Sequence, residues 1–220
     1  MVADVVCPYC YIGLTRLQRA IAATAHTTPI DVSYIPFILQ PHLPKSGVPK
    51  LEVLRQELKS EARAKRIMAQ VGATAALDGL QFNVHGQRAG NSADAHRLLL
   101  WAGARMQSLF EAMAKAYNEQ EEWLGDYDVL MRAVNRAGLC VDEASTVLLD
   151  PSAYADELEA GLRQAQELGV TSVPAFFVNE HLLGTGALSE GAIRAVIQWI
   201  SAPVHLQAHL EAHGTVASTR

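Results

Sequence analysis

Residues typical of β-strands lie only near the two ends of this chain, and a long, almost entirely helical stretch separates them. The apolar stub 2–6 and the alternating run 30–37 predict strands near the start, and 173–178 and 181–184 predict a hairpin near the end. Between them, apolar residues from 51 to 169 recur at helical spacing. This order predicts an α/β fold, a small sheet with helices inserted into its middle.

The chain is therefore expected to fold in two parts. The sheet domain would be built from 1–50 and 169–202, and the helical insertion would comprise 51–168. The hairpin is expected to turn at residues 179–180, where Asn and Glu interrupt the β-forming run. The last residues, 203–220, are rich in Ala, His and Thr and are expected to form a mobile tail.

Composition excludes several classes of protein. Half of the 220 residues are hydrophobic and 19% are charged, which excludes disorder along the whole chain. The net charge of −5 argues against a general nucleic-acid binder, and no apolar run is long enough to predict a membrane span. Three cysteines do not suit a disulfide-held secreted scaffold, and the first residues lack the pattern of a signal peptide. We therefore expect a cytoplasmic protein with reactive cysteines.

The sequence Cys7-Pro8-Tyr9-Cys10 stands at the start of a helix expected over 8–25. Cysteines at positions i and i+3 share a helix face and lie within reach of a disulfide. The first sulfur would sit at the positive end of the helix, which lowers a thiol pKa. We therefore predict that Cys7 is the exposed, attacking thiolate and that Cys10, which is more buried, is the resolving thiol.

Two other interpretations of this cysteine pair stay open. Half of a zinc site would need two more ligands, and neither Cys140 nor the eight scattered histidines show zinc-knuckle spacing, so no metal is expected. The pair could also be two core cysteines that are neighbours by coincidence. A redox dithiol accounts for the strand before the motif and the helix after it, and it needs no cofactor because the two sulfurs carry the electrons.

A second element of the expected site lies far away in sequence, at Gly169 to Pro174. A proline at the first residue of a strand can be cis, although an ordinary trans proline at a strand edge stays open. A cis Val173–Pro174 bond would leave backbone groups of Val173 unpaired, so a bound peptide could add a short strand there and present its sulfur to Cys7. The predicted substrate-binding residues are Pro8, Tyr9, Val173 and Pro174.

Three stretches carry a resemblance to a known family: Asp4 to Gly13, Asn91 to Leu98, and Gly169 to Pro174. In these the chain resembles the DsbA-like thiol–disulfide oxidoreductases of the thioredoxin-fold superfamily, most closely their cytoplasmic FrnE-type branch. The resemblance implies a thioredoxin-like fold with a large all-helical insertion. It also implies disulfide exchange with Cys7 as nucleophile, Cys10 as resolving thiol and Pro174 as a cis-proline facing them.

The chain departs from this family pattern in three respects. Tyr9 stands where the FrnE-type branch more often has Trp, and this position tunes the redox potential. The strand before the motif is only a stub, whereas a central strand of about 5–6 residues is usual. Cys-Pro-Tyr-Cys is also the motif of glutaredoxins, so glutathione stays open as a co-substrate.

Two rival functions follow from the same residues. One is a glutathione-dependent transferase or isomerase of the kappa-class or hydroxychromene-carboxylate type, in which serine typically replaces the first cysteine. The other is a non-catalytic peptide-binding or chaperone module with an incidental dithiol. The expected partner is a protein or small molecule with a thiol or disulfide, and no nucleic-acid or membrane partner is expected. A homodimer stays open.

Four further residues are interpreted more simply. Asp4 is expected to be a solvated carboxylate at the end of the first strand, with an interaction with the dithiol as the alternative. His96 and Arg97 are expected to pack within the insertion, with substrate contact as the alternative. Cys140 is expected to be a half-buried thiol without a partner.

Overall fold

The computed structural model describes residues 1–24, 30–178 and 181–201, so the expected hairpin turn and the expected tail after residue 202 lie outside the described residues. The elements are short strands and longer helices, and most of the helices follow one another in the middle of the chain. They are β1 (Val2–Ala3), α1 (Pro8–Thr24), β2 (Ile35–Pro36), β3 (Val48–Pro49), α2 (Lys50–Leu58), α3 (Glu61–Ala76), β4 (Arg88–Ala89), α4 (Ala93–Trp101), α5 (Met106–Gln120), α6 (Tyr127–Arg136), α7 (Val141–Leu149), α8 (Ala155–Glu167), β5 (Ala175–Val178), β6 (His181–Thr185) and α9 (Glu190–Ser201).

The two ends of the chain share one sheet, with the strand order β2-β1-β5-β6. Strand β1 runs parallel to β2 and antiparallel to β5, so Val2 lies opposite Ile35 on one side and Ala175 on the other. Strands β5 and β6 form the expected antiparallel hairpin. The predicted α/β class, with helices inserted into a small sheet, is confirmed.

The strands at the start of the chain are shorter than the sequence predicts. Of the run 30–37, only Ile35–Pro36 pairs, and of the stub 2–6 only Val2–Ala3 pairs. Ile35 and Phe37 donate to the carbonyls of Met1 (2.9 Å) and Ala3 (3.0 Å), and the pairing of β2 stops because β1 offers only two residues. Strand β1 ends because the chain turns at Asp4, whose carbonyl accepts the N–H of Cys7 at 3.0 Å.

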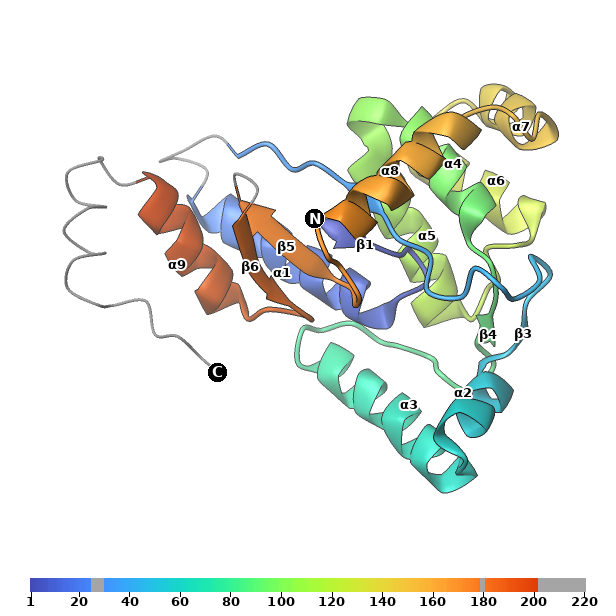
Figure 1. Ribbon diagram of the computed structural model, residues 1–220, viewed down its shortest axis with the longest axis horizontal. Helices are drawn as coiled ribbons and strands as arrows, with labels where there is room; N and C mark the ends of the chain where they lie inside the picture. The colour runs from blue at the N-terminus through green and yellow to red at the C-terminus, as the bar shows by residue number, and fades with distance from the viewer. Residues whose placement is uncertain (25–29, 179–180, 202–220) are drawn as a thin grey trace.

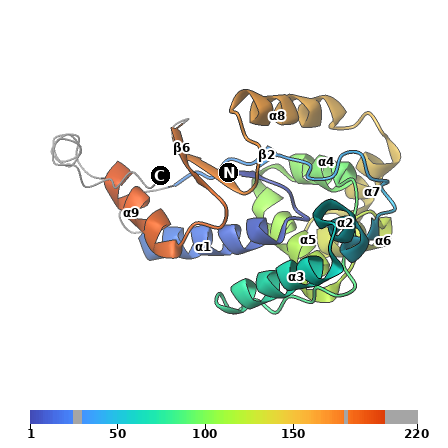
Figure 2. The same cartoon turned by 60° about the horizontal axis from the view of Figure 1, so that its bottom comes forward.

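Helices cover both faces of the sheet. Figure 2 shows α8 above the sheet and α1 with α9 below it. On the α8 face, Ala165 packs against Val2 and Ala175. On the other side, α1 and α9 pack together through Ala20, Ile193 and Ile197. None of the helices in the described ranges is long and apolar enough to cross a membrane.

The insertion forms most of the right-hand part of the molecule in Figure 1. Helices α4 to α7 pack together around large buried side chains such as Leu98, Phe110 and Leu130. Helices α2 and α3 form a separate pair at the lower right of Figure 1. Strands β3 and β4, which the sequence does not predict, form a short antiparallel pair. Strand β3 directly precedes α2 and β4 follows α3, so this pair of strands closes the segment that holds the two helices. Cys7 and Cys10 belong to the same apolar cluster as the insertion core.

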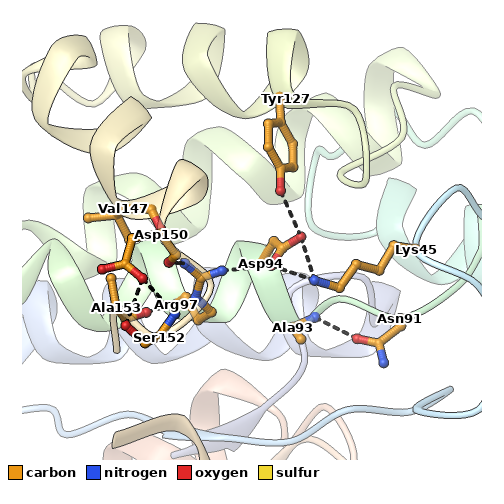
Figure 3. Close-up of polar contacts among 10 residues, drawn as sticks. All are labelled: Lys45, Asn91, Ala93, Asp94, Arg97, Tyr127, Val147, Asp150, Ser152 and Ala153. Atoms are coloured by element: carbon orange, nitrogen blue, oxygen red, sulfur yellow. Dashed lines mark hydrogen bonds and ion pairs between the residues drawn. The ribbon is translucent and has the colours of Figure 1, made fainter. Parts of the chain in front are cut away.

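Arg97 joins α4 to the end of α7 and to the segment between α7 and α8, and it forms a buried ion pair within α4 (Figure 3). Asp94 and Arg97 are both 5% exposed, and their charged groups lie 3.1 Å apart. The guanidinium of Arg97 also donates to the carbonyls of Val147, Asp150 and Ala153. Arg97 is therefore a packing residue, as the sequence predicts.

Removal of the Arg97 guanidinium should destabilise the fold. In Arg97→Met, the Asp94 carboxylate and three carbonyls lose a buried donor, so we expect the free energy of unfolding to fall by about 3–5 kcal/mol. Urea unfolding measures this change. The control Arg163→Met removes an arginine whose side chain is 57% exposed and should change stability by less than about 0.5 kcal/mol. An equal loss in both variants would contradict a structural role for Arg97.

Candidate active site

The two motif cysteines lie at the junction between β1 and α1. The turn at Asp4 leads into α1, which begins at Pro8, where the missing N–H of proline costs nothing. Cys7 directly precedes the helix and Cys10 occupies its first turn; both are free thiols. The thiol and the backbone N–H of Cys10 both donate to the Cys7 sulfur. The helix start therefore directs two donors at one sulfur, which favours the thiolate at Cys7.

The two thiols are shifted in opposite directions. The hydrogen bond from the Cys10 thiol lowers the pKa of Cys7; burial and the charge of Asp4 oppose this, and the charge of Lys50 supports it. The pKa of Cys10 is raised well above the usual thiol value by burial, then by its hydrogen bond to Cys7 and the charge there. Cys7 is thus the thiol that ionises first.

Cys7 is not exposed at the molecular surface, so that part of the prediction is wrong. The residue is 4% exposed and Cys10 is 0% exposed. The sequence could not show that the insertion helices α2 and α3 lie over the start of α1. They leave a cavity of about 290 Å³, and Cys7 forms part of its wall whereas Cys10 does not. Access to Cys7 is therefore through this cavity.

The segment around Pro174 lies against the dithiol. The Val173–Pro174 peptide bond is cis, and the Cys7 sulfur lies 3.6 Å from the carbonyl oxygen of Val173. Gly13 on α1 allows this close approach, because a Cβ there would lie 3.2 Å from the Pro174 ring. The expected substrate-binding residues divide accordingly: Pro8, Tyr9 and Val173 line the cavity with Cys7, and Pro174 packs behind it against α1.

Asp4 is fully buried, which contradicts the expected solvated carboxylate. One carboxylate oxygen accepts from the backbone N–H of Val6 (3.2 Å) and the hydroxyl of Ser92 (2.9 Å) and lies 3.1 Å from Nε2 of His96. The other accepts from the N–H of Leu39 at 2.8 Å. The start of α4 covers Asp4, and these partners replace the water it loses. Its charge raises the pKa of both Cys7 and Cys10.

His96 is buried beside Asp4, whereas Cys140 lies at the surface. The imidazole of His96 does not pack only within the insertion as predicted: Nε2 lies 3.1 Å from Asp4 and Nδ1 lies 2.7 Å from the hydroxyl of Tyr34, both in the segment 1–50. Cys140 is exposed at the start of α7, and the expectation of a half-buried thiol is wrong. Within the described ranges, no cluster of metal-ligating side chains is present.

Four polar residues of the cavity are not singled out by the sequence: Gln40, Lys50, Gln87 and Tyr117. The pairing of β3 with β4 brings Lys50 beside Gln87, and the Lys50 ammonium donates to the side-chain oxygen of Gln87 at 2.9 Å. It also donates to the Tyr117 hydroxyl at 3.3 Å. These residues come from three distant parts of the chain, so no motif or spacing connects them.

Comparison with known proteins identifies the family. The family model of the DSBA-like thioredoxin domain matches residues 1–198. This chain belongs to the DsbA-like thioredoxin family. Its membership places it among thiol–disulfide oxidoreductases and isomerases in general. A comparison with curated proteins finds no match.

Solved structures extend this comparison. A probable DsbA oxidoreductase from Streptomyces coelicolor is similar over 100% of this chain and 91% of its own, with a TM-score of 0.82 and 30% identity. A 2-hydroxychromene-2-carboxylate isomerase is similar over 98% of both chains, with a TM-score of 0.62 and 12% identity. The cytosolic disulfide reductase DsbM from Pseudomonas aeruginosa with GSH is similar over 96% of both, with a TM-score of 0.53 and 19% identity. The last two likenesses concern the fold alone.

Alkylation should distinguish the two thiols. In the reduced protein we expect iodoacetamide to modify Cys7 before Cys10, because the Cys7 thiolate forms at lower pH. Peptide mass mapping over a pH series measures both rates. Cys10→Ala removes the thiol donor and should move the Cys7 profile to higher pH, whereas Cys10→Ser keeps a donor and should move it less. Faster modification of Cys10 than of Cys7 would contradict the assignment.

The buried charge of Asp4 gives a second prediction. Asp4→Asn removes the charge and keeps the shape, so the pKa of Cys7 and of Cys10 should both fall, and thiolate should appear at lower pH. Ultraviolet absorbance of the thiolate during a pH titration measures the shift. Asp31→Asn, at an exposed position, is the control and should leave the titration unchanged. A shift to higher pH in Asp4→Asn would show that its charge does not act on the thiols as described.

Proposed function

We propose that this protein is a thiol–disulfide oxidoreductase in which Cys7 is the nucleophile and Cys10 the resolving thiol. The observation that carries the proposal is the asymmetry of the pair. The pKa of Cys7 is lowered and that of Cys10 raised, and only Cys7 lines the cavity. Cys7 is thus the thiolate that attacks a substrate, and Cys10 stays protonated beside it until a mixed disulfide forms.

The exchange proceeds in two steps. The Cys7 thiolate attacks a substrate disulfide, forming a bond between Cys7 and one substrate sulfur and releasing the other as a thiolate. Cys10 then loses its proton and attacks the Cys7 sulfur, which forms the Cys7–Cys10 disulfide and releases the second substrate thiolate. The substrate gains two electrons and the protein loses two. The reverse sequence oxidises a dithiol, and no metal or nucleotide takes part.

The groups around Cys7 would bind the substrate. We propose that Pro8, Tyr9 and Val173 contact it in the cavity, and that Pro174 holds Val173 in place. We further propose a division into a sheet domain of 1–50 and 169–202, which supplies the dithiol, and an insertion of 51–168, whose helices α2 and α3 supply the opposite cavity wall.

Glutathione is the alternative redox partner. The DsbM reductase from Pseudomonas aeruginosa, which has a related fold, was solved with GSH and is described as cytosolic. We propose a cytoplasmic role for this chain as well, within the FrnE-type branch. Because an isomerase shares this fold, a glutathione-dependent transferase or isomerase is the second candidate function. Such enzymes typically carry serine in place of the first cysteine, whereas this chain has Cys7.

Three single variants test the proposed roles. With insulin as the disulfide and dithiothreitol as the reductant, Cys7→Ser should reduce insulin no faster than the uncatalysed background. Incubated with insulin in the absence of dithiothreitol, reduced Cys10→Ser should accumulate a mixed disulfide through Cys7, because the resolving thiol is missing. The control Cys140→Ser should retain the activity of the unmodified protein. Mass spectrometry and insulin turbidity measure these outcomes.

Equal activity of Cys7→Ser and the unmodified protein would contradict the proposed function and favour a peptide-binding module. A mixed disulfide that forms through Cys10 instead of Cys7 would reverse the two roles. Retention of a glutathione-dependent transferase or isomerase activity by Cys7→Ser would favour the second candidate.

A further inference from the structure

The cavity beside Cys7 is lined by the ammonium group of Lys50, on which the negative charges of Cys7 and Asp4 act without forming an ion pair. The ammonium of Lys50 is held by the side-chain oxygen of Gln87 and the hydroxyl of Tyr117, and it lies 5.2 Å from the centre of the Tyr117 ring. Among the described residues, no carboxylate forms an ion pair with it. Burial lowers the pKa of Lys50 to about 8, which shows that this charge is poorly solvated. A poorly solvated charge is stabilised by an anion, and the cavity has room for one.

Gln87 supplies a second donor at the same place. Its side chain is 2% exposed, and its oxygen accepts from Lys50, so its amide nitrogen points elsewhere. In the described part of the chain this buried nitrogen has no hydrogen-bond partner. Buried donors are almost always paired in folded proteins, so an unpaired one beside a cavity indicates a missing acceptor. Lys50 and Gln87 together provide the charge and the second N–H that a carboxylate accepts.

The rest of the cavity is mainly apolar. Its wall on the side of α2 and α3 includes Val53, Leu54, Met68 and Val71. Cys7 lies on another part of the same wall, and the volume of about 290 Å³ suits a small molecule. The cavity therefore combines three requirements for a ligand, namely an anionic group, an apolar body and a sulfur that reaches Cys7.

We propose that the substrate of Cys7 is a small thiol or disulfide with an apolar body and a carboxylate, and that Lys50 and Gln87 bind this carboxylate. This inference rests on the proposed function and names its substrate class. For a disulfide, Cys7 forms a bond to one substrate sulfur as the S–S bond breaks, and the other sulfur leaves as a thiolate. Attack by Cys10 releases the second carboxylate-bearing thiolate, so the disulfide is reduced to two thiols and the protein is oxidised.

A pair of matched disulfides tests the proposal with the full chain. The probes are 4,4′-dithiodibenzoic acid and its neutral diamide, which share the same body and the same reacting sulfurs. In Lys50→Met, the rate constant for oxidation of the reduced protein should fall for both probes, because the charge of Lys50 supports the Cys7 thiolate, and it should fall about tenfold or more further for the diacid than for the diamide. Lys50→Arg keeps the positive charge, so this variant should still react faster with the diacid than with the diamide. The control Lys115→Met, at an exposed position, should react with both probes like the unmodified protein.

A binding measurement separates this proposal from the proposed function. In Cys7→Ser, which cannot exchange disulfides, 4-(methylthio)benzoate should bind, and adding Lys50→Met or Gln87→Leu should weaken its binding. Calorimetric titration measures this, and circular dichroism verifies that each variant is folded. Absence of binding to Cys7→Ser would overturn the carboxylate site even if disulfide exchange is confirmed. An equal loss of rate for diacid and diamide in Lys50→Met would also overturn it, because Lys50 would then act only on the Cys7 thiolate.

Discussion

The pairing of β1 with β5 is the constraint on which the rest of the structure depends. Val2 lies opposite Ala175, so the strand that leads to Cys7 is held beside the strand that follows Pro174. This places the Cys7 sulfur 3.6 Å from the Val173 carbonyl, although the two residues are separated by the whole insertion. Gly13 allows the proline ring to pack on α1 behind the dithiol. The site thus exists only where strands from the two parts of the chain that flank the insertion pair in the middle of the sheet.

The insertion changes this sheet-based site into an enclosed one. Helices α2 and α3 form a wall opposite Cys7, and α4 covers Asp4 with Ser92 and His96. Enclosure has two electrostatic consequences. It strengthens the influence of Asp4 and Lys50 on the thiols, since charges interact more strongly away from water. It also leaves Lys50 on the wall of a mainly apolar cavity, beside Gln87, whose buried amide nitrogen has no hydrogen-bond partner among the described residues.

The fold class, the helical character of 51–169 and the position of the first helix could be predicted because they depend on local patterns. The helix after the motif was expected over 8–25 and is observed at Pro8–Thr24, since its apolar spacing and its starting proline act within a few residues. The strand expected over 30–37 is reduced to Ile35–Pro36 because strand length depends on the partner strand. The burial of Asp4 and Cys7 was missed for a similar reason, since distant helices cover them.

The sequence by itself determined that a cysteine pair stands at a helix start, that strand residues occur at both ends of the chain, and that a proline begins a late strand. These features follow from local backbone preferences and spacing. Only the tertiary structure decided that Cys7 faces a cavity, that Asp4 is buried among four partners, and that Lys50 lies beside Gln87. Burial and charge pairing depend on segments far apart in sequence, and no local pattern contains that information.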